Sequence, residues 1–244
     1  MKARGGRNLY GHAIGILVLD TVFPRIPGDI GHAGTFPFPV LYHKVRNAFP
    51  SRVVREGDPG LLEGFVAGAR ALEASGVLAI TTSCGFLALF QRQLAEAVRV
   101  PVFTSALQLV PLVSRMLGPD RAVGVLTVDA LALGPRHLAG AGITEDIKLV
   151  IRGLERGHAF TPVLLENETE LDVDAARREN VDAARELIER HPEVGAIVLE
   201  CTNMPPYAAA IREATGLPVF DITTLVRLVY AALHPSVYRE GVTQ

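Results

Sequence analysis

The sequence contains only two cysteines and no long apolar run, and these absences exclude several classes of protein. The formal net charge is −2, without a basic stripe that would follow a phosphate backbone, so nucleic acid is not an expected partner. The longest apolar runs, such as residues 194–199, are far shorter than the roughly 20 residues that span a bilayer. The N-terminal apolar segment is also short and has no small-residue cleavage site. We therefore expect a cytoplasmic protein without a membrane span.

The cysteines and histidines show no spacing typical of metal ligands. Neither cysteine has a second one within C-x-x-C reach, and the seven histidines form no close pair. The sequence therefore predicts no metal site and no disulfide framework. A lone cysteine in such a chain is most often a small buried apolar residue, but a repeat within the chain changes that interpretation.

The two halves of the chain resemble each other. IGILVLD at 14–20 is matched by VGVLTVD at 123–129, an offset of 109 residues. Cys84 is matched by Cys201, an offset of 117 residues, and PVF at 101 and at 218 has the same offset. Each cysteine also follows a helical pattern and then a short apolar run.

Short Ile/Val/Leu runs that alternate with amphipathic helices are typical of parallel strands buried on both faces. The sequence therefore predicts an α/β protein with two pseudo-symmetric, flavodoxin-like parallel-sheet domains and an active site in the cleft between them. The predicted domains are residues 1–110 plus 222–244, and residues 111–221. The predicted strands are 14–19, 77–81, 123–128 and 196–199.

Two segments outside this repeat carry further predictions. Residues 21–40 are rich in proline and glycine and have no helical period, and they leave the edge of the sheet where ligands bind. We expect this long loop to be a flap that covers the site. Residues 223–240 are expected to form a helix that Pro235 ends and that packs back on the first half.

The matched cysteines lie where chemistry is expected. Asp20, Asp129, Cys84 and Cys201 all follow strand ends, and open α/β sheets bind ligands at the carboxyl ends of their strands. Thiols that face each other across a cleft would approach a substrate from opposite sides, so that one removes a proton and the other delivers one. An ordinary thiol pKa of about 8.5 is within tuning range of neutrality, and helix N-termini stabilise the thiolate.

At these motifs the chain resembles the aspartate/glutamate/hydantoin racemase superfamily. The resemblance rests on ITTSCGF around Cys84, LECTNMPPY around Cys201, the strand IGILVLD and the loop PGDIGHAGTFPFPV. It implies racemisation or epimerisation of a small amino acid or a hydantoin, without pyridoxal phosphate, metal or other cofactor, with Cys84 and Cys201 as the acid/base pair. The implied partner is a small carboxylate or cyclic-amide substrate, and relatives of this fold often form dimers.

Two other classes of function remain open. One is a decarboxylase, lyase or maleate-type cis-trans isomerase of the same fold, in which a single cysteine is essential. The other is a two-lobed protein that binds a small molecule without catalysis.

The sequence departs from the racemase pattern beside both cysteines. Gly85 and Phe86 follow Cys84 where amino-acid racemases of the family carry Asn-Thr, and Asn203 stands where glutamate racemases carry a histidine. Phe86 either lines the pocket or packs under a helix. Because side chains alternate along a strand, Glu200 is expected to point away from the site and to have no catalytic role. The candidate substrate-binding residues are Asp20, Thr82, Ser83, Gly85, Thr127, Thr202 and Asn203. Helix capping is the alternative role for Asp20, Thr82 and Ser83, and Thr127 faces a similar choice.

Overall fold

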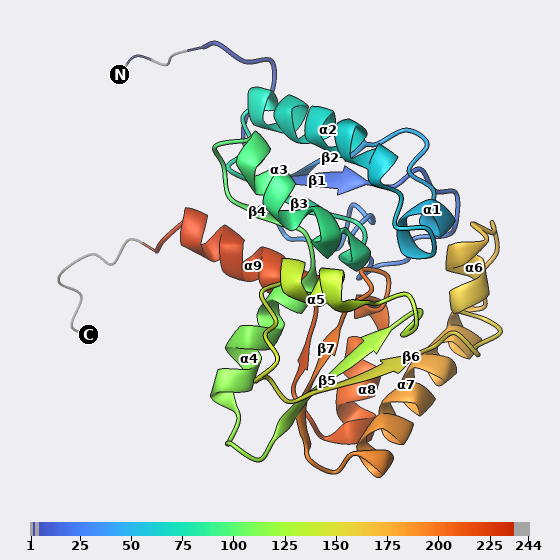
Figure 1. Cartoon of the computed structure of the whole chain (residues 1–244). Helices are drawn as coiled ribbons and strands as arrows, with labels where there is room; N and C mark the ends of the chain where they lie inside the picture. Colours follow the sequence, from blue (N-terminus) through green and yellow to red (C-terminus); the bar gives the residue numbers. More distant parts are fainter. Residues whose placement is uncertain (1, 3–4, 237–244) are drawn as a thin grey trace, which may run out of the picture.

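The structure is a computed structural model that describes residue 2 and residues 5–236. Its two halves each contain a four-stranded, all-parallel sheet, with strand orders β2-β1-β3-β4 and β6-β5-β7-β8 (Figure 1). Both orders follow the flavodoxin-like pattern, in which the second strand lies outside the first. The predicted α/β class with two parallel sheets is confirmed.

The first half begins at β1 and runs to the helix that enters the second half. Its elements are β1 (Ile14–Val18), β2 (Val40–Lys44), α1 (Pro50–Val54), the 3₁₀ turn η1 (Pro59–Leu61), α2 (Leu62–Ser75), β3 (Ala79–Thr82), the 3₁₀ turn η2 (Gly85–Phe90), α3 (Gln91–Ala97), β4 (Val102–Phe103), the 3₁₀ turn η3 (Ala106–Leu109) and α4 (Val110–Met116).

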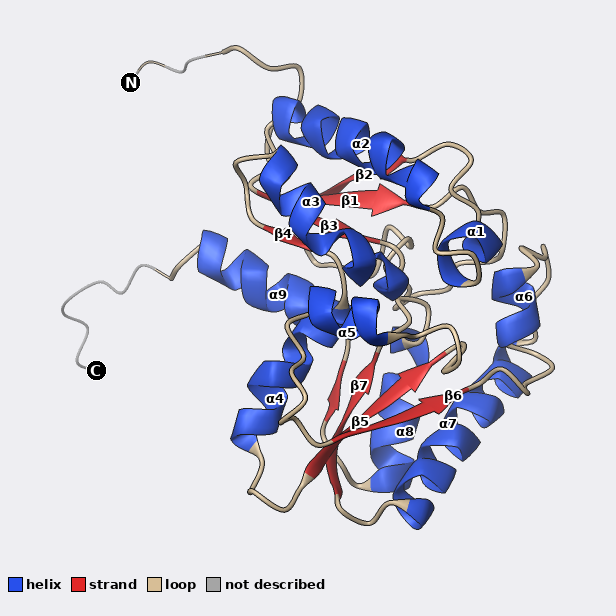
Figure 2. Ribbon diagram, in the orientation of Figure 1, coloured by secondary structure: helices blue, strands red, loops and turns tan. Residues whose placement is uncertain are grey.

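The second half repeats this order with small changes. Its elements are β5 (Ala122–Thr127), α5 (Pro135–Gly140), β6 (Leu149–Gly153), α6 (Thr161–Leu165), α7 (Val173–Arg190), β7 (Val194–Leu199), the 3₁₀ turn η4 (Pro205–Tyr207), α8 (Ala208–Thr215), β8 (Val219–Phe220) and α9 (Ile222–Leu233). The four predicted strands are present, with ends shifted by at most two residues. Helices flank the second sheet on both sides, with α4 on one side and α7 and α8 on the other (Figure 2).

The repeat extends to the packing of helix on strand. In β1, a Cβ added at Gly15 would lie 3.0 Å from Leu72 of α2, and in β5 a Cβ added at Gly124 would lie 2.7 Å from Leu187 of α7. The missing side chain therefore lets each leucine press against the strand, and both leucines are almost fully buried. Burial of one leucine side chain contributes about 1.5–3 kcal/mol.

The helix after the last strand of each half crosses to the other half. α4 leaves the first sheet and contacts β5, whereas α9 leaves the second sheet and returns toward the first half. There Tyr230 of α9 stacks on Phe38, with ring centroids 3.6 Å apart. The predicted packing of the C-terminal helix on the first half is thus observed. Residues 237–240 of that predicted helix lie outside the described residues, as do residues 1, 3–4 and 237–244 of the predicted first domain. The domain boundaries remain a prediction.

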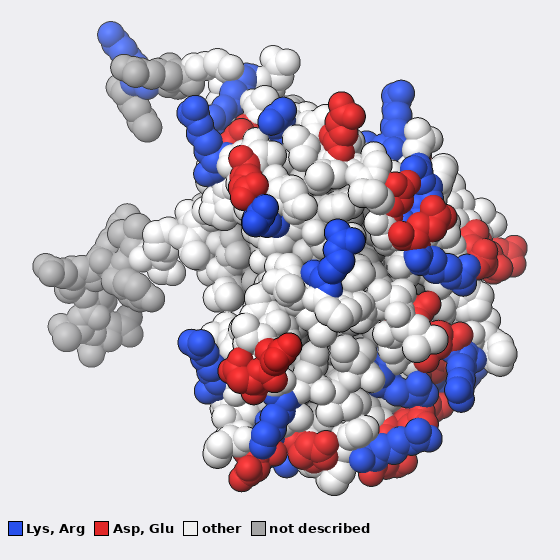
Figure 3. All heavy atoms as spheres, viewed as in Figure 1, with Lys and Arg blue, Asp and Glu red and all other residues white. Residues whose placement is uncertain are grey.

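The surface carries interspersed charges of both signs on the face shown in Figure 3, in keeping with the small net charge. None of the described helices is both long enough and apolar enough to cross a membrane.

Candidate active site

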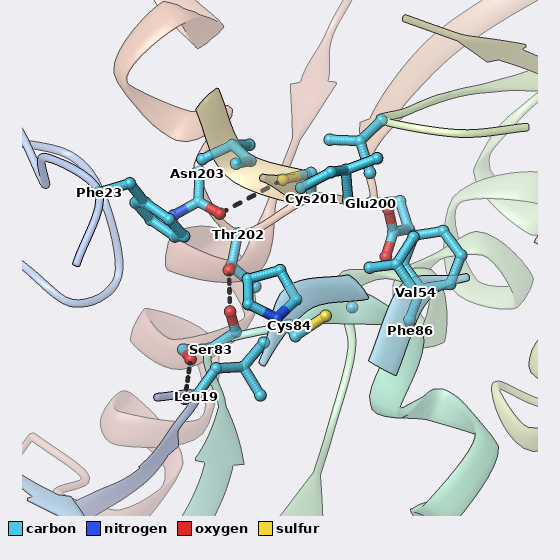
Figure 4. Close-up of a pocket in the computed structure, with 15 residues that line it drawn as sticks. Leu19, Phe23, Val54, Ser83, Cys84, Phe86, Glu200, Cys201, Thr202 and Asn203 are labelled. Atoms are coloured by element: carbon cyan, nitrogen blue, oxygen red, sulfur yellow. Dashed lines mark hydrogen bonds between the residues drawn. The ribbon is translucent and has the colours of Figure 1, made fainter. Parts of the chain in front are cut away.

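A small cavity lies between the two halves, at the carboxyl ends of their central strands, and each half contributes one thiol to it (Figure 4). The first half contributes Leu19, Phe23, Pro50, Val54, Ser83, Cys84, Gly85 and Phe86, and the second half contributes Val128, Leu164, Leu165, Glu200, Cys201, Thr202 and Asn203. The cavity volume is about 30 Å³, room for about two water molecules. A substrate of several carbon atoms therefore requires the walls or the flap to move outward.

Both thiols are buried and protonated at neutral pH. Burial, followed by the nearby Glu200 carboxyl, raises the pKa of Cys84 to about 12, although the backbone N–H groups of Phe86 and Leu87 act in the opposite direction. The same two causes raise the pKa of Cys201. The predicted stabilisation by N–H groups at the start of a helical turn is present, but desolvation outweighs it. A thiolate in this cavity therefore needs a positive charge nearby.

Thr82 and Ser83 hold the loop that carries Cys84. The Thr82 hydroxyl lies 2.7 Å from the carbonyl oxygen of Thr104 and accepts a hydrogen bond from the Cys84 N–H at 3.4 Å. The Ser83 Oγ accepts a hydrogen bond from the Leu19 N–H at 3.0 Å. Thr82 thus contacts backbone groups, and Ser83 is the one of the two that lines the cavity.

Thr202 and Asn203 connect the second cysteine to the first half. The Thr202 hydroxyl donates to the carbonyl oxygen of Ser83 at 2.6 Å. The Asn203 amide group donates to the Asp29 carboxylate, and its oxygen lies 3.6 Å from the Cys201 Sγ, which donates to it. These contacts fix the relative position of the halves at the cavity.

The loop 21–40 covers one side of the cavity, as a flap would. Phe23 lines the cavity, and the Ile30 N–H donates to the carbonyl oxygen of Thr202 at 3.4 Å. Arg25 forms an ion pair with Asp29 at 2.7 Å, and both side chains are largely buried. No sequence pattern pointed to Phe23, Arg25 or Asp29 individually. Charged residues inside a proline- and glycine-rich loop at the ligand-binding edge are nevertheless a usable signal.

Glu200 lies in the cavity wall, so the prediction that its side chain points away from the site is wrong. The strict alternation of a strand ends with β7 at Leu199, and the chain bends at Cys201. The Thr127 hydroxyl donates to Glu200 Oε2 at 2.8 Å. Burial raises the pKa of Glu200 to about 8, and the hydrogen bond from Thr127 lowers it in part. Thr127 therefore positions Glu200 and is not itself a lining residue.

Asp20 does not lie in the cavity wall. Its carboxylate accepts from Lys44 Nζ at 3.0 Å and from the Asn47 N–H at 3.2 Å, and these hydrogen bonds lower the pKa of Asp20. Asp129, the matching residue of the second half, caps the N–H groups of Leu131 and Ala132. The contacts of Asp20 therefore lend no support to a substrate-binding role. They are not those of a helix N-cap either, because Phe49 is the N-cap of α1, the helix that follows Asn47.

Phe86 fulfils both of the roles considered for it. Its ring lines the cavity and also packs edge-on against His137, with ring centroids 5.3 Å apart. Among the residues that the structure describes, no group of three or more His, Cys, Asp or Glu side chains is arranged to hold a metal ion.

Comparison with known proteins agrees with this architecture. Residues 55–227, a range that includes both cysteines and Glu200, match the family model described as Asp/Glu/Hydantoin racemase. The chain belongs to the Asp/Glu/hydantoin racemase family.

Relatives of this racemase-family chain include lyases. It is 30% identical to a dimethylsulfoniopropionate lyase of Durusdinium sp. clade D, over 88% of this chain and 72% of that protein. It is 32% identical to dimethylsulfoniopropionate lyase 5 of Emiliania huxleyi, over 90% of this chain but only 45% of that protein. Among solved structures, the Gly74Cys mutant of arylmalonate decarboxylase in the sulfate-associated form superposes with a TM-score of 0.61 at 21% identity, over 93% of this chain and 96% of the other. The chain is thus similar in sequence to proteins named as lyases and shares its fold with a protein named as a decarboxylase.

Proposed function

We propose that this racemase-family protein is a cofactor-independent lyase that cleaves dimethylsulfoniopropionate or a closely related sulfonium carboxylate. The carrying observation is the similarity to proteins named dimethylsulfoniopropionate lyase, at 30–32% identity over about nine tenths of this chain. The buried thiols and the carboxyl group in one cavity support proton removal from a carbon atom.

The proposed reaction is an elimination whose atoms and electrons balance without a cofactor. A thiolate removes a proton from the carbon next to the carboxylate, and the electron pair of that C–H bond forms the new C=C bond. The C–S bond breaks, and its electron pair remains on sulfur. The products are dimethyl sulfide, acrylate and one proton, which passes from the thiol to solvent. The positive sulfonium group also supplies the charge that a thiolate in this cavity needs.

The contacts of the two thiols favour Cys84 as the base. Two backbone N–H groups, those of Phe86 and Leu87, lower the pKa of Cys84 and so favour its thiolate. Only one, that of Asn203, lowers the pKa of Cys201, which donates its own S–H to the Asn203 oxygen. In this proposal Cys201 lines the site and supports the reaction as a thiol.

The test is to incubate the protein with dimethylsulfoniopropionate and to measure dimethyl sulfide by gas chromatography and acrylate by proton NMR. Equal amounts of both products, formed in proportion to enzyme, are expected. Failure to form either product at high enzyme concentration would contradict the proposal.

A racemase is the second candidate, and the placement of one thiol on each side of the cavity favours it. In heavy water, single enantiomers of aspartate, glutamate or 5-substituted hydantoins would then exchange the hydrogen on the stereocentre and yield the antipode. Substituted malonates and maleate in the same panel test the decarboxylase and isomerase alternatives.

A further inference from the structure

The wall of the cavity contains one carboxyl group, and no cationic side chain in the described part of the wall would balance its charge on ionisation. Glu200 is fully buried, and its Oε2 is bonded to Thr127. Its Oε1 is also buried and has no hydrogen-bond partner among the described residues. A buried polar atom without a partner costs about 1–3 kcal/mol, so its retention at a reactive site calls for a ligand that uses it.

The rest of the wall is apolar or uncharged. No lysine, arginine or histidine of the described chain lines the cavity, and eight lining residues have apolar side chains. These are Leu19, Phe23, Pro50, Val54, Phe86, Val128, Leu164 and Leu165. Arg25, which acts electrostatically on Cys84, has its charge matched by Asp29 at 2.7 Å. The groups near Glu200 that can ionise are the two thiols, one from each half.

The carboxyl group is also held in place from both sides. Thr127 fixes one oxygen, and the backbone of Gly85 lies against the other, because a Cβ at position 85 would overlap Glu200 Oε1. A carboxyl group held in place among apolar walls, once ionised, matches a methylated onium group, which is positive but has no N–H or O–H to donate. An unmethylated ammonium group carries three N–H donors and would instead need several hydrogen-bond acceptors in the same place.

We propose that Glu200 is the counter-ion of the substrate's onium group and selects carboxylates that carry a methylated sulfonium or ammonium group over their neutral isosteres. This inference rests on the proposed function, since it assigns the group that recognises the proposed leaving group. The raised pKa of Glu200, about 8, means that the carboxyl is protonated at neutral pH. Binding of the cation therefore ionises Glu200 and releases a proton to solvent.

The test uses two probes of the same shape that differ in charge. 3-(Trimethylammonio)propanoate carries the onium group but has a poor leaving group, and 4,4-dimethylpentanoate is its neutral isostere. Both are titrated by calorimetry at pH 7 in two buffers with different heats of ionisation. For the wild-type protein we expect the cationic probe to bind at least tenfold more tightly and with release of close to one proton, and the neutral probe to release none.

The Glu200→Gln variant should bind the cationic probe at least tenfold more weakly and without proton release, with the neutral probe changed less than twofold. Exposed Glu189 on α7 offers the matched control, since Glu189→Gln removes the same charge from the surface. Equal weakening of the binding of both probes, or proton release that persists in Glu200→Gln, would overturn the inference.

If the variant does not fold, a measurement on the wild-type protein tests the inference. The affinity for the cationic probe should rise as pH approaches 8, whereas that for the neutral probe should not, and a pH-independent affinity for the cationic probe would overturn the inference. Neither probe needs to react, so the result is independent of whether dimethyl sulfide is formed.

Discussion

The two halves of the molecule share a backbone but differ in the side chains around their thiols. Ser83 and Glu200 occupy matched positions in the two halves. The Ser83 N–H donates to the carbonyl oxygen of Leu17 at 2.9 Å, and the Glu200 N–H donates to the carbonyl oxygen of Leu126 at 2.8 Å. The next residue in each half is a cysteine. The scaffold therefore places two equivalent thiols, while serine in one half and glutamic acid in the other make their surroundings unequal.

The segments that follow the first strand of each half differ as well. After β1 the chain forms the flap, residues 21–40, which covers one side of the cavity and forms hydrogen bonds with the second half. After β5 the matching segment forms α5, which packs on η2 and leaves the cavity wall to other residues. A racemase that works in both directions needs two comparable bases, whereas an elimination needs one. The unequal surroundings therefore agree better with the lyase proposal.

The largest effect is expected when the two cysteines are replaced one at a time. Cys84→Ala should reduce the rate of dimethyl sulfide formation by roughly 10²- to 10⁴-fold, the usual contribution of a general base. Cys201→Ala should retain at least tenfold more activity than Cys84→Ala. Initial rates, with circular dichroism to check folding, measure this difference. Equal losses in the two variants would show that both thiols act, as in a two-base racemase.

Glu200 should also make the free energy of unfolding depend on pH. Ser83, at the matched position of the first half, does not titrate and has no such effect. The pKa of Glu200 is raised from its ordinary 4.5 to about 8, so the native protein binds this proton more tightly than the unfolded chain does. The stabilising effect is present at low pH and is lost as pH rises from about 4.5 to 8, by up to about 1.4 kcal/mol per pH unit. Urea denaturation between about pH 5 and pH 8 should show this slope in the wild type and in Glu189→Gln. The slope should be reduced in Glu200→Gln, and an unchanged slope there would contradict the raised pKa.

The sequence predicted the features that follow from the internal repeat, namely the two sheets and the shared site of the two cysteines. Matched apolar runs predicted two parallel sheets, and the position of Cys84 and Cys201 after strand ends predicted that they share one site. Strands β2 and β6 were not predicted, because they are only partly buried and lack a strong apolar run.

The features that the sequence did not predict depend on contacts between the halves. Alternation along a strand predicts the direction of a side chain only while the strand continues, and Glu200 stands where β7 has ended. The bond from Asn203 to Asp29 joins residues 174 positions apart, and local patterns carry no information about it. Asp20 and Asp129 lie at strand ends, as the repeat predicted, but their hydrogen bonds lie outside the cavity. Asp20 accepts from Lys44 on β2, and Asp129 accepts from the nearby Leu131 N–H.

Gly85 tests how closely the two halves approach each other. Gly85→Ala would place a Cβ against the Glu200 carboxyl and its backbone carbonyl oxygen. Overpacking of this kind costs about 1–3 kcal/mol, and the displaced carboxyl should also lower activity. The control is Gly118→Ala, because Gly118 is exposed and a Cβ there would meet only Arg121, 4.0 Å away. Unfolding in urea and initial rates measure both effects, and a Gly85→Ala variant as stable and active as Gly118→Ala would show that the approach is looser than described.

The smallest effect is expected where α9 returns to the first half and Tyr230 stacks on Phe38. Tyr230→Ala removes the ring that stacks on Phe38 at the end of the flap. Aromatic pairs contribute about 0.5–1.5 kcal/mol beyond the area they bury, so this variant should lose about 1 kcal/mol more of its free energy of unfolding than Leu228→Ala. Leu228 is the matched control because it lies on the same helix and is 52% exposed.

Because Phe38 belongs to the flap, Tyr230→Ala should also make residues 21–40 easier for a protease to cleave. Equal losses of stability in the two variants, with unchanged cleavage, would mean that the return of α9 does not anchor the flap.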